Sequence, residues 1–238
     1  MKLIVFSQHF WPEKFRINSI VNYLSKNNII KRLTVFTAKP NYPKGKILKG
    51  YKKFSFEKER KNHVTIYRTQ IIPRNDAKTI NLILNYISYI ISGLINLVKI
   101  KNNYDIVFVY CTSPIFQAIP AIIFSKIRKI PLVLWVQDLW PDSVQETGYI
   151  KNKFIIGIIK FITKIIYNNS DLILVQSRQF VKPIKELTKT NVKIFLNPSE
   201  FNFVKKNKFI NRIKKNKRIY YAGNIGSVQN LNNLIKFC

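Results

Sequence analysis

Gln137 and Asp138 are the polar pair whose place in the sequence best suits catalysis. They directly follow the apolar run 132–136, which is typical of a buried parallel strand. A carboxylate at this point can orient a hydroxyl group or stabilise positive charge on a reacting carbon. Trp140 and Pro141 stiffen the loop that follows. The alternative is structural: Asp138 caps a turn and Trp140 covers the edge of the sheet.

His9, Glu13 and Arg16 form a second polar group, in the loop after the apolar run 2–7. His9 is either a ligand contact or a buried structural histidine. Arg16 either serves a phosphate by its charge or faces solvent. The loop lacks the glycine-rich dinucleotide fingerprint, so the sequence does not support a nicotinamide or flavin site. No His/Cys cluster has the spacing of a metal site, and we expect no metal.

Short apolar runs alternate with helical patterns along the first 200 residues. The expected strands are 2–7, 33–37, 64–69, 106–110, 132–136, 172–175 and 192–195. Strands separated by helices predict an α/β fold with a Rossmann-like, doubly wound, mainly parallel sheet. Because such folds bind ligands at the carboxyl ends of their strands, both polar groups are expected at that edge.

The chain carries a large excess of positive charge, with 41 Lys and Arg against 11 Asp and Glu, a net charge of +30. A nucleic acid, an anionic membrane surface or a phosphorylated substrate would each account for this excess, as would a general drift in composition. A nucleic-acid partner is not expected, because no helix-turn-helix, zinc finger or RNA-binding signature is visible.

Two apolar segments lie between basic residues. Segment 79–98 has no charge over about one bilayer-spanning length. Its asparagines would be costly facing lipid, so a buried or interface-docked helix is favoured over a spanning one. Segment 154–167, with Lys160 and Lys164 four residues apart, is either an ordinary outer helix or a second membrane-surface element.

We expect an N-terminal domain over residues 1–200, a basic linker over 201–218, and the start of a second domain over 219–238. The run 219–222 is expected to form that domain's first strand, with a helix beginning before the chain ends. Two cysteines form no disulfide framework, and Cys111 is interpreted as a packing residue. No signal peptide is visible, so a cytoplasmic location is expected.

Several segments occur in an order that resembles glycosyltransferase family 4, of the GT-B fold. They are 8–13 with 15–18, 39–43, 135–143, 175–178 and 223–226. The branch they resemble is that of the N-acetyl-fucosaminyltransferase-like enzymes of O-antigen, lipopolysaccharide and capsule biosynthesis. The resemblance implies two Rossmann-like domains, an acceptor-binding N-terminal one and a donor-binding C-terminal one. It implies sugar transfer without a metal, from a UDP-linked donor to a lipid-pyrophosphate-linked acceptor at the inner face of the cytoplasmic membrane.

The resemblance also assigns roles by position. Asp138 takes the catalytic place, and Gln137 stands where most members have a histidine. The other assigned residues are His9, Glu13, Gln137 and Trp140 for the acceptor, and Arg16, Gly223, Asn224 and Gly226 for the donor phosphates. Backbone N–H groups of the glycine-containing loop would approach the pyrophosphate.

The paired glutamates of the family's donor domain have no counterpart in these 238 residues. The resemblance therefore implies a partial chain that does not transfer sugar alone, unless a separately encoded C-terminal half completes it. Two other functions stay open: a basic nucleic-acid-binding protein, and a membrane-surface scaffold without catalysis.

Overall fold

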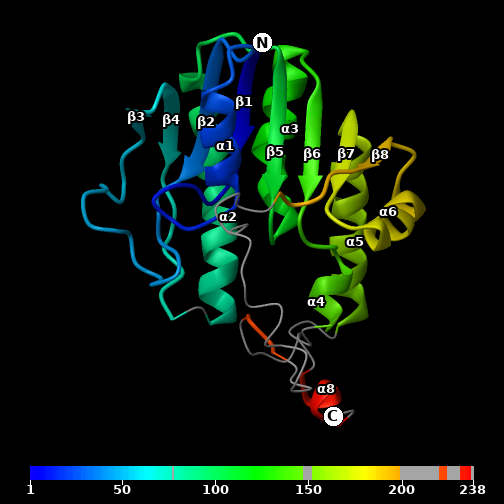
Figure 1. Cartoon of the computed structure of the whole chain (residues 1–238). Coiled ribbons are helices and arrows are strands. Elements are labelled where there is room, and N and C mark those ends of the chain that lie inside the picture. Colours follow the sequence, from blue (N-terminus) through cyan, green and yellow to red (C-terminus); the bar gives the residue numbers. More distant parts are fainter. Residues whose placement is uncertain (77, 147–151, 199–219, 224–230, 237–238) are drawn as a thin grey trace, which may run out of the picture.

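Eight strands form one sheet in the computed structural model, in the order β3-β4-β2-β1-β5-β6-β7-β8 (Figure 1). Neighbouring strands are parallel, except that β3 pairs with β4 in the antiparallel sense. The structure describes residues 1–76, 78–146, 152–198, 220–223 and 231–236. The strands are β1 (Lys2–Phe6), β2 (Arg32–Ala38), β3 (Glu57–Lys61), β4 (Val64–Thr69), β5 (Ile106–Cys111), β6 (Leu132–Val136), β7 (Leu172–Val175) and β8 (Val192–Ile194).

Helices connect most of the parallel strands. The α-helices are α1 (Ile17–Ser25), α2 (Thr79–Asn96), α3 (Ile119–Arg128), α4 (Asp142–Glu146), α5 (Lys153–Asn168), α6 (Val181–Leu187) and α8 (Leu231–Lys236). Three short 3-10 helices adjoin them: η1 (Leu97–Lys99), η2 (Ile115–Ala118) and η3 (Arg178–Phe180). The Ser177 hydroxyl accepts a hydrogen bond from the Gln179 N–H and caps the start of η3.

The strand order reverses between β1 and β5. From β1 the chain moves outward through β2 to β4, and it then crosses to β5 and proceeds in the other direction to β8. The register sets Phe6 beside Val109, and Cys111 beside Val136. The loops after β1, β5 and β6 therefore begin side by side at a topological switch point, the place where doubly wound sheets bind ligands. The predicted Rossmann-like, mainly parallel fold is confirmed.

Two apolar cores pack on opposite faces of the sheet. The first lies between the sheet and α2, α3, α5 and α6, and it includes the buried thiol of Cys111, as predicted. Burial raises the pKa of that thiol. The second lies between the sheet and α1, where Ile17 and Val21 meet Trp135 and Tyr110 among other buried residues.

Strand β3 was not predicted from the sequence, because its residues Glu57–Lys61 are all charged. It is an edge strand, and its glutamates neutralise cations buried beneath it. Glu57 lies 2.5 Å from Nζ of Lys39, and Glu59 lies 2.6 Å from a guanidinium nitrogen of Arg68. Burial lowers the pKa of Lys39, and the Glu57 carboxylate opposes that shift. Charge pairing rather than apolar patterning thus places this strand.

The C-terminal predictions are only partly open to comparison. The predicted strand 219–222 is wrong where it is described, because Tyr220–Ala222 has no regular structure and pairs with none of the described strands. The helix expected before the chain end is present as α8. The basic segment 201–218, Asn224 and Gly226 lie outside the described residues, and the predicted role of Gly223 stays a prediction.

Candidate functional site

Amide side chains join the loops at the carboxyl edge of the sheet. The backbone N–H of Gln8, after β1, donates to Oε1 of Gln117 at 3.0 Å. The Gln8 side-chain nitrogen donates to Oδ1 of Asn85 in α2 at 2.8 Å. Asn85 in turn donates to Oδ1 of Asn41, after β2, at 3.3 Å. Helix α2 is thereby tied to the loops after β1 and β2, and it forms one side of the site.

Glu13 holds two of these loops together. One of its carboxylate oxygens accepts the backbone N–H groups of Asn41 and Tyr42, both at 2.7 Å, and the other lies 2.9 Å from Nδ1 of His9. The His9 ring stacks on Phe15 with centroids 4.6 Å apart. His9 and Glu13, both predicted to contact the acceptor, are buried. Both carboxylate oxygens of Glu13 contact groups of the protein itself. The structure gives Glu13 a role in positioning the loops, and its predicted contact with an acceptor stays a prediction.

Asp138 lies where the sequence places it, directly after β6 and half-buried. Its Oδ2 accepts the backbone N–H and the hydroxyl of Ser113, after β5, each at 2.8 Å. Among the described residues, no hydrogen bond reaches Oδ1. One oxygen of Asp138 therefore caps a turn, as the structural interpretation expects, and its catalytic role stays a prediction.

Trp140 has the structural role that the sequence left as its alternative. Its Nε1 donates to the Ser113 hydroxyl at 3.0 Å, and its ring packs edge-on against Phe116. Trp140 is buried, and its predicted acceptor contact stays a prediction. Its hydrogen bond orients Ser113, which in turn orients Asp138.

Buried amide atoms without partners mark the same edge. Within the described residues, Oε1 of Gln8, Nε2 of Gln137 and Oδ1 of Asn197 are buried and form no hydrogen bond. They follow β1, β6 and β8 respectively. Unpaired buried polar atoms are costly, and they call for an explanation such as a bound polar molecule. An amide both donates and accepts, as a hydroxyl does, so this edge suits a molecule rich in hydroxyl groups.

Asp138 and two arginines affect the pKa values of the same two tyrosines. Burial raises the pKa of Tyr110 to about 12, with Arg16 opposing the rise and Asp138 adding to it. Burial also raises the pKa of Tyr86. The charge of Arg74 opposes this rise, and the charge of Asp138 adds to it. Asp138 is thus within electrostatic reach of the tyrosines that feel each guanidinium. The Arg16 guanidinium donates to the Pro198 carbonyl, and its predicted phosphate role stays a prediction.

Arg74 is a site residue that the sequence did not single out. Its Nε is buried without a hydrogen-bond partner in the described part of the chain, and its guanidinium lies 5.4 Å from the centroid of the Tyr42 ring. An arginine held in place with a free N–H is suited to an anion. Its position after a predicted strand, following Ile72 and Pro73, was the available signal.

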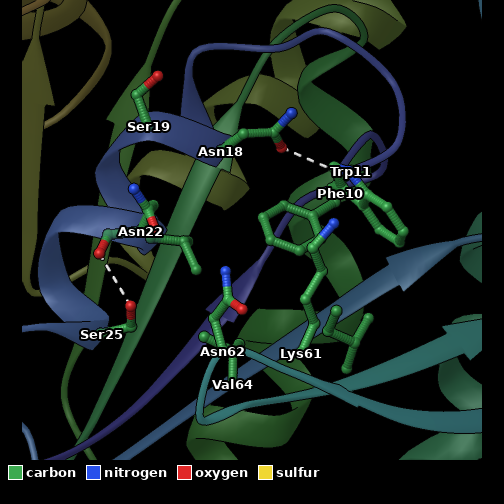
Figure 2. A pocket seen from close by; sticks show the side chains of 11 residues that line it. Phe10, Trp11, Asn18, Ser19, Asn22, Ser25, Lys61, Asn62 and Val64 are labelled. Carbon is green, nitrogen blue, oxygen red and sulfur yellow. Dashed lines mark hydrogen bonds between the residues drawn. The ribbon is translucent and has the colours of Figure 1, made fainter.

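A groove beside this site has a separate lining. Figure 2 shows it between α1 and the β3–β4 edge of the sheet, with a volume of about 280 Å³. Phe10 and Trp11 lie at its mouth, and Nζ of Lys61 lies 2.9 Å from the centroid of the Trp11 ring. Asn18 accepts the Trp11 N–H at 2.9 Å. The groove takes no residue from the loops after β5 and β6, so it is distinct from the Asp138 edge.

In the described ranges, no group of three or more His, Cys, Asp or Glu side chains is placed to hold a metal ion. The acids of the site are engaged singly: Glu13 with backbone N–H groups and His9, and Asp138 with Ser113. The chemistry assembled at this edge is that of amides, guanidinium groups and one carboxylate oxygen.

No family model matches the sequence, and no curated protein matches it either. Solved structures do match the fold. An α,α-trehalose-phosphate synthase (UDP-forming) from Burkholderia vietnamiensis superposes with a TM-score of 0.50 at 10% identity, covering 82% of this chain and 47% of that chain. The chain has a Rossmann-like GT-B domain fold.

Two further matches are a sucrose-phosphate synthase from Thermosynechococcus elongatus and Anabaena HepE in complex with UDP and glucose. The first has a TM-score of 0.49 and 14% identity, covering 85% of this chain and 91% of that chain. HepE has a TM-score of 0.47 and 11% identity, covering 85% and 46%. The GT-B domain described here spans less than half the length of the HepE and trehalose-phosphate synthase chains.

Proposed function

We propose that this chain is the acceptor-binding part of a glycosyltransferase that moves a sugar from a UDP-linked donor to a lipid-pyrophosphate-linked acceptor. The observation that carries the proposal is the carboxyl edge at the β1–β5 switch point. There, within the described residues, Oδ1 of Asp138 and several buried amide atoms of the same edge have no hydrogen-bond partner. The UDP complex of HepE and the UDP-forming synthase, which share the fold, support a nucleotide-sugar donor.

Asp138 is proposed as the catalytic carboxylate. Ser113 fixes its Oδ2 through two hydrogen bonds, so Oδ1 has a defined direction. That oxygen would accept a hydrogen bond from the acceptor hydroxyl and stabilise positive charge developing at the anomeric carbon. Gln137 would donate its unpaired Nε2–H to a neighbouring hydroxyl of the same sugar.

Arg74 is proposed to bind the pyrophosphate of the acceptor. The contact with the Tyr42 ring positions the Arg74 guanidinium at the side of the site that α2 forms. Its Nε, which has no partner among the described residues, is available to a phosphate oxygen. A guanidinium matches phosphate oxygens in both charge and geometry. Arg16 would contribute charge from the opposite side. A lipid-linked acceptor of surface polysaccharide assembly would place the protein peripherally on the inner face of the cytoplasmic membrane.

Replacing Arg74 by alanine is expected to weaken acceptor binding by about 10- to 100-fold, because one charged hydrogen bond to phosphate contributes about 1.5–3 kcal/mol. The measurement is titration calorimetry of the chain with a short-chain prenyl-pyrophosphate bearing N-acetylglucosamine. Arg60→Ala is the matched control, since it removes an exposed arginine of β3 away from the site. Equal affinity of the Arg74 variant and the unaltered chain, or no binding by the unaltered chain, would contradict the proposal.

A further inference from the structure

Helix α2 has its polar residues inside and its apolar residues outside. Asn85, Tyr89 and Asn96 are fully or almost fully buried against the sheet. Asn96 donates to Oγ1 of Thr69 and Oε1 of Gln70, and Asn85 donates to the loop carbonyl of Ile72 at 2.6 Å. Asn85 and the amide nitrogen of Asn96 are therefore satisfied by the protein, whereas Oδ1 of Asn96 is buried without a hydrogen-bond partner in the described part of the chain. This is the reverse of the pattern expected for a helix whose outer face meets water.

The outer side of α2 carries an apolar stripe that continues into η1. Its side chains are between 40% and 78% exposed and recur at helical spacing: Ile80, Ile83, Leu84, Ile87, Ile91, Ile95 and Val98. The stretch Thr79–Lys99 is long and apolar enough to cross a bilayer by length and composition. Single exposed apolar residues are ordinary, but a contiguous stripe of this length marks a binding surface.

Helices α3 and α5 extend the apolar surface on the same face of the sheet. All three helices pack on one core, with α2 against α3 and α5 against η2. The exposed apolar residues of α5 and α3 are Phe154, Ile155, Ile158, Phe161, Ile165, Ile123 and Ile127. We call the α2 stripe and these residues together the isoleucine face. Residues 154, 158, 161 and 165 recur at helical spacing, as those of α2 do.

The charges around the isoleucine face are mainly positive, and Asp76 beside the start of α2 pairs with Lys78 at 3.1 Å. Within α2, α3 and α5 there is no Asp or Glu. Basic side chains lie within or immediately beside these helices: Lys78, Lys99, Lys101, Lys126, Arg128, Lys129, Lys153, Lys160 and Lys164. Exposed apolar residues combined with lysines and arginines match a membrane surface whose acyl chains are apolar and whose headgroups are anionic.

Other arrangements fit less well. A second copy of the chain would bring its own charge of +30 against the same basic residues, which disfavours self-association. Insertion of α2 across a bilayer would break the hydrogen bonds of Asn85 to Gln8 and Asn41, which hold the carboxyl edge together. A helix lying on the membrane keeps those bonds and still buries the stripe.

We infer that the isoleucine face docks the protein on an anionic bilayer, with α2, α3 and α5 lying on the surface. Helix α2 then has the membrane on one side and the site on the other, because Asn85 accepts a hydrogen bond from the Gln8 side chain on its inner side. Figure 1 shows α2 continuing past the carboxyl edge of the sheet. The inference rests on the proposed function only where it assumes that the acceptor is lipid-linked. Docking on a bilayer can be measured without any sugar.

The test is co-sedimentation of the chain with vesicles of phosphatidylcholine containing 30% phosphatidylglycerol, which hold no lipid-linked sugar. The chain is expected to sediment with these vesicles. The triple variant Ile87→Ser/Ile91→Ser/Ile95→Ser is expected to bind about 10- to 100-fold more weakly, because apolar area no longer leaves water. These side chains point outward, so circular dichroism should show an unchanged fold.

Tyr23→Ser/Ile29→Ser is the matched control, because Tyr23 and Ile29 are 70% and 69% exposed but belong to the α1 side. This variant should bind as the unaltered chain does. The inference is overturned if the chain stays in the supernatant, if the triple variant binds normally, or if both variants lose binding equally. It is also overturned if sedimentation velocity shows a dimer that the triple variant abolishes, since the occupant is then a second copy. If the chain binds vesicles but does not bind the acceptor, the docking inference is supported and the proposed function is rejected.

Discussion

Replacing Glu13 by alanine is expected to lower the free energy of unfolding by about 3–5 kcal/mol, measured by urea denaturation. The reason is that three groups lose their partner at once: the buried N–H of Asn41, the buried His9 ring and the part-buried N–H of Tyr42. Water does not replace them, because Glu13 and Asn41 are buried.

Glu186→Ala is the control for this change, since Glu186 is exposed on α6 and its removal should alter stability by no more than about 0.5 kcal/mol. Glu13→Gln should lie between the two, because the amide oxygen still accepts N–H groups but carries no charge. An unfolding midpoint of Glu13→Ala equal to that of Glu186→Ala would show that Glu13 does not hold the loops together.

Replacing Asp138 by asparagine is expected to reduce sugar transfer by about 10²–10⁴-fold in a preparation that contains a functional donor domain. The amide oxygen of asparagine still accepts from Ser113, so the loop keeps its shape, while an NH₂ group takes the place of the free oxygen. Acceptor binding should fall by a smaller factor, about 10-fold, because only one hydrogen bond in the ground state is lost.

Asp171→Asn is a closely matched control. Asp171 accepts the backbone N–H of Leu132 at 2.7 Å, at the opposite end of the same strand β6. The two variants make the same chemical change at the two edges of the sheet, so only the carboxyl-edge variant should lose transfer. Equal rates for both would remove Asp138 from the chemistry.

The sheet was predictable because its strands are apolar runs flanked by turns, and the loops after β1 and β6 were predictable because parallel strands place their ends together. The position of Asp138 followed directly from this reasoning. The role of Glu13 did not, because its partners are backbone N–H groups after β2, and no side-chain pattern announces them.

Arg74 and α2 show a second limit. Counting apolar residues along 79–98 indicates a helix but does not say which side faces the sheet. The structure orients Asn85 and Asn96 toward Gln8 and Thr69 and the isoleucines outward, so α2 is buried along one side and exposed along the other. Strand β3 was not predicted for a related reason, because its glutamates pair with cations that are distant in the sequence.

Photocrosslinking tests the central claim most directly. A prenyl-pyrophosphate-linked sugar with a diazirine on the sugar is bound to the chain, irradiated, and the labelled peptides are identified by mass spectrometry. Label is expected in the loops after β5 and β6, around Ser113 and Asp138, with competition by unlabelled acceptor. Label confined to the groove beside α1, around Trp11 and Asn22, or label that excess acceptor does not displace, would contradict sugar binding at the carboxyl edge.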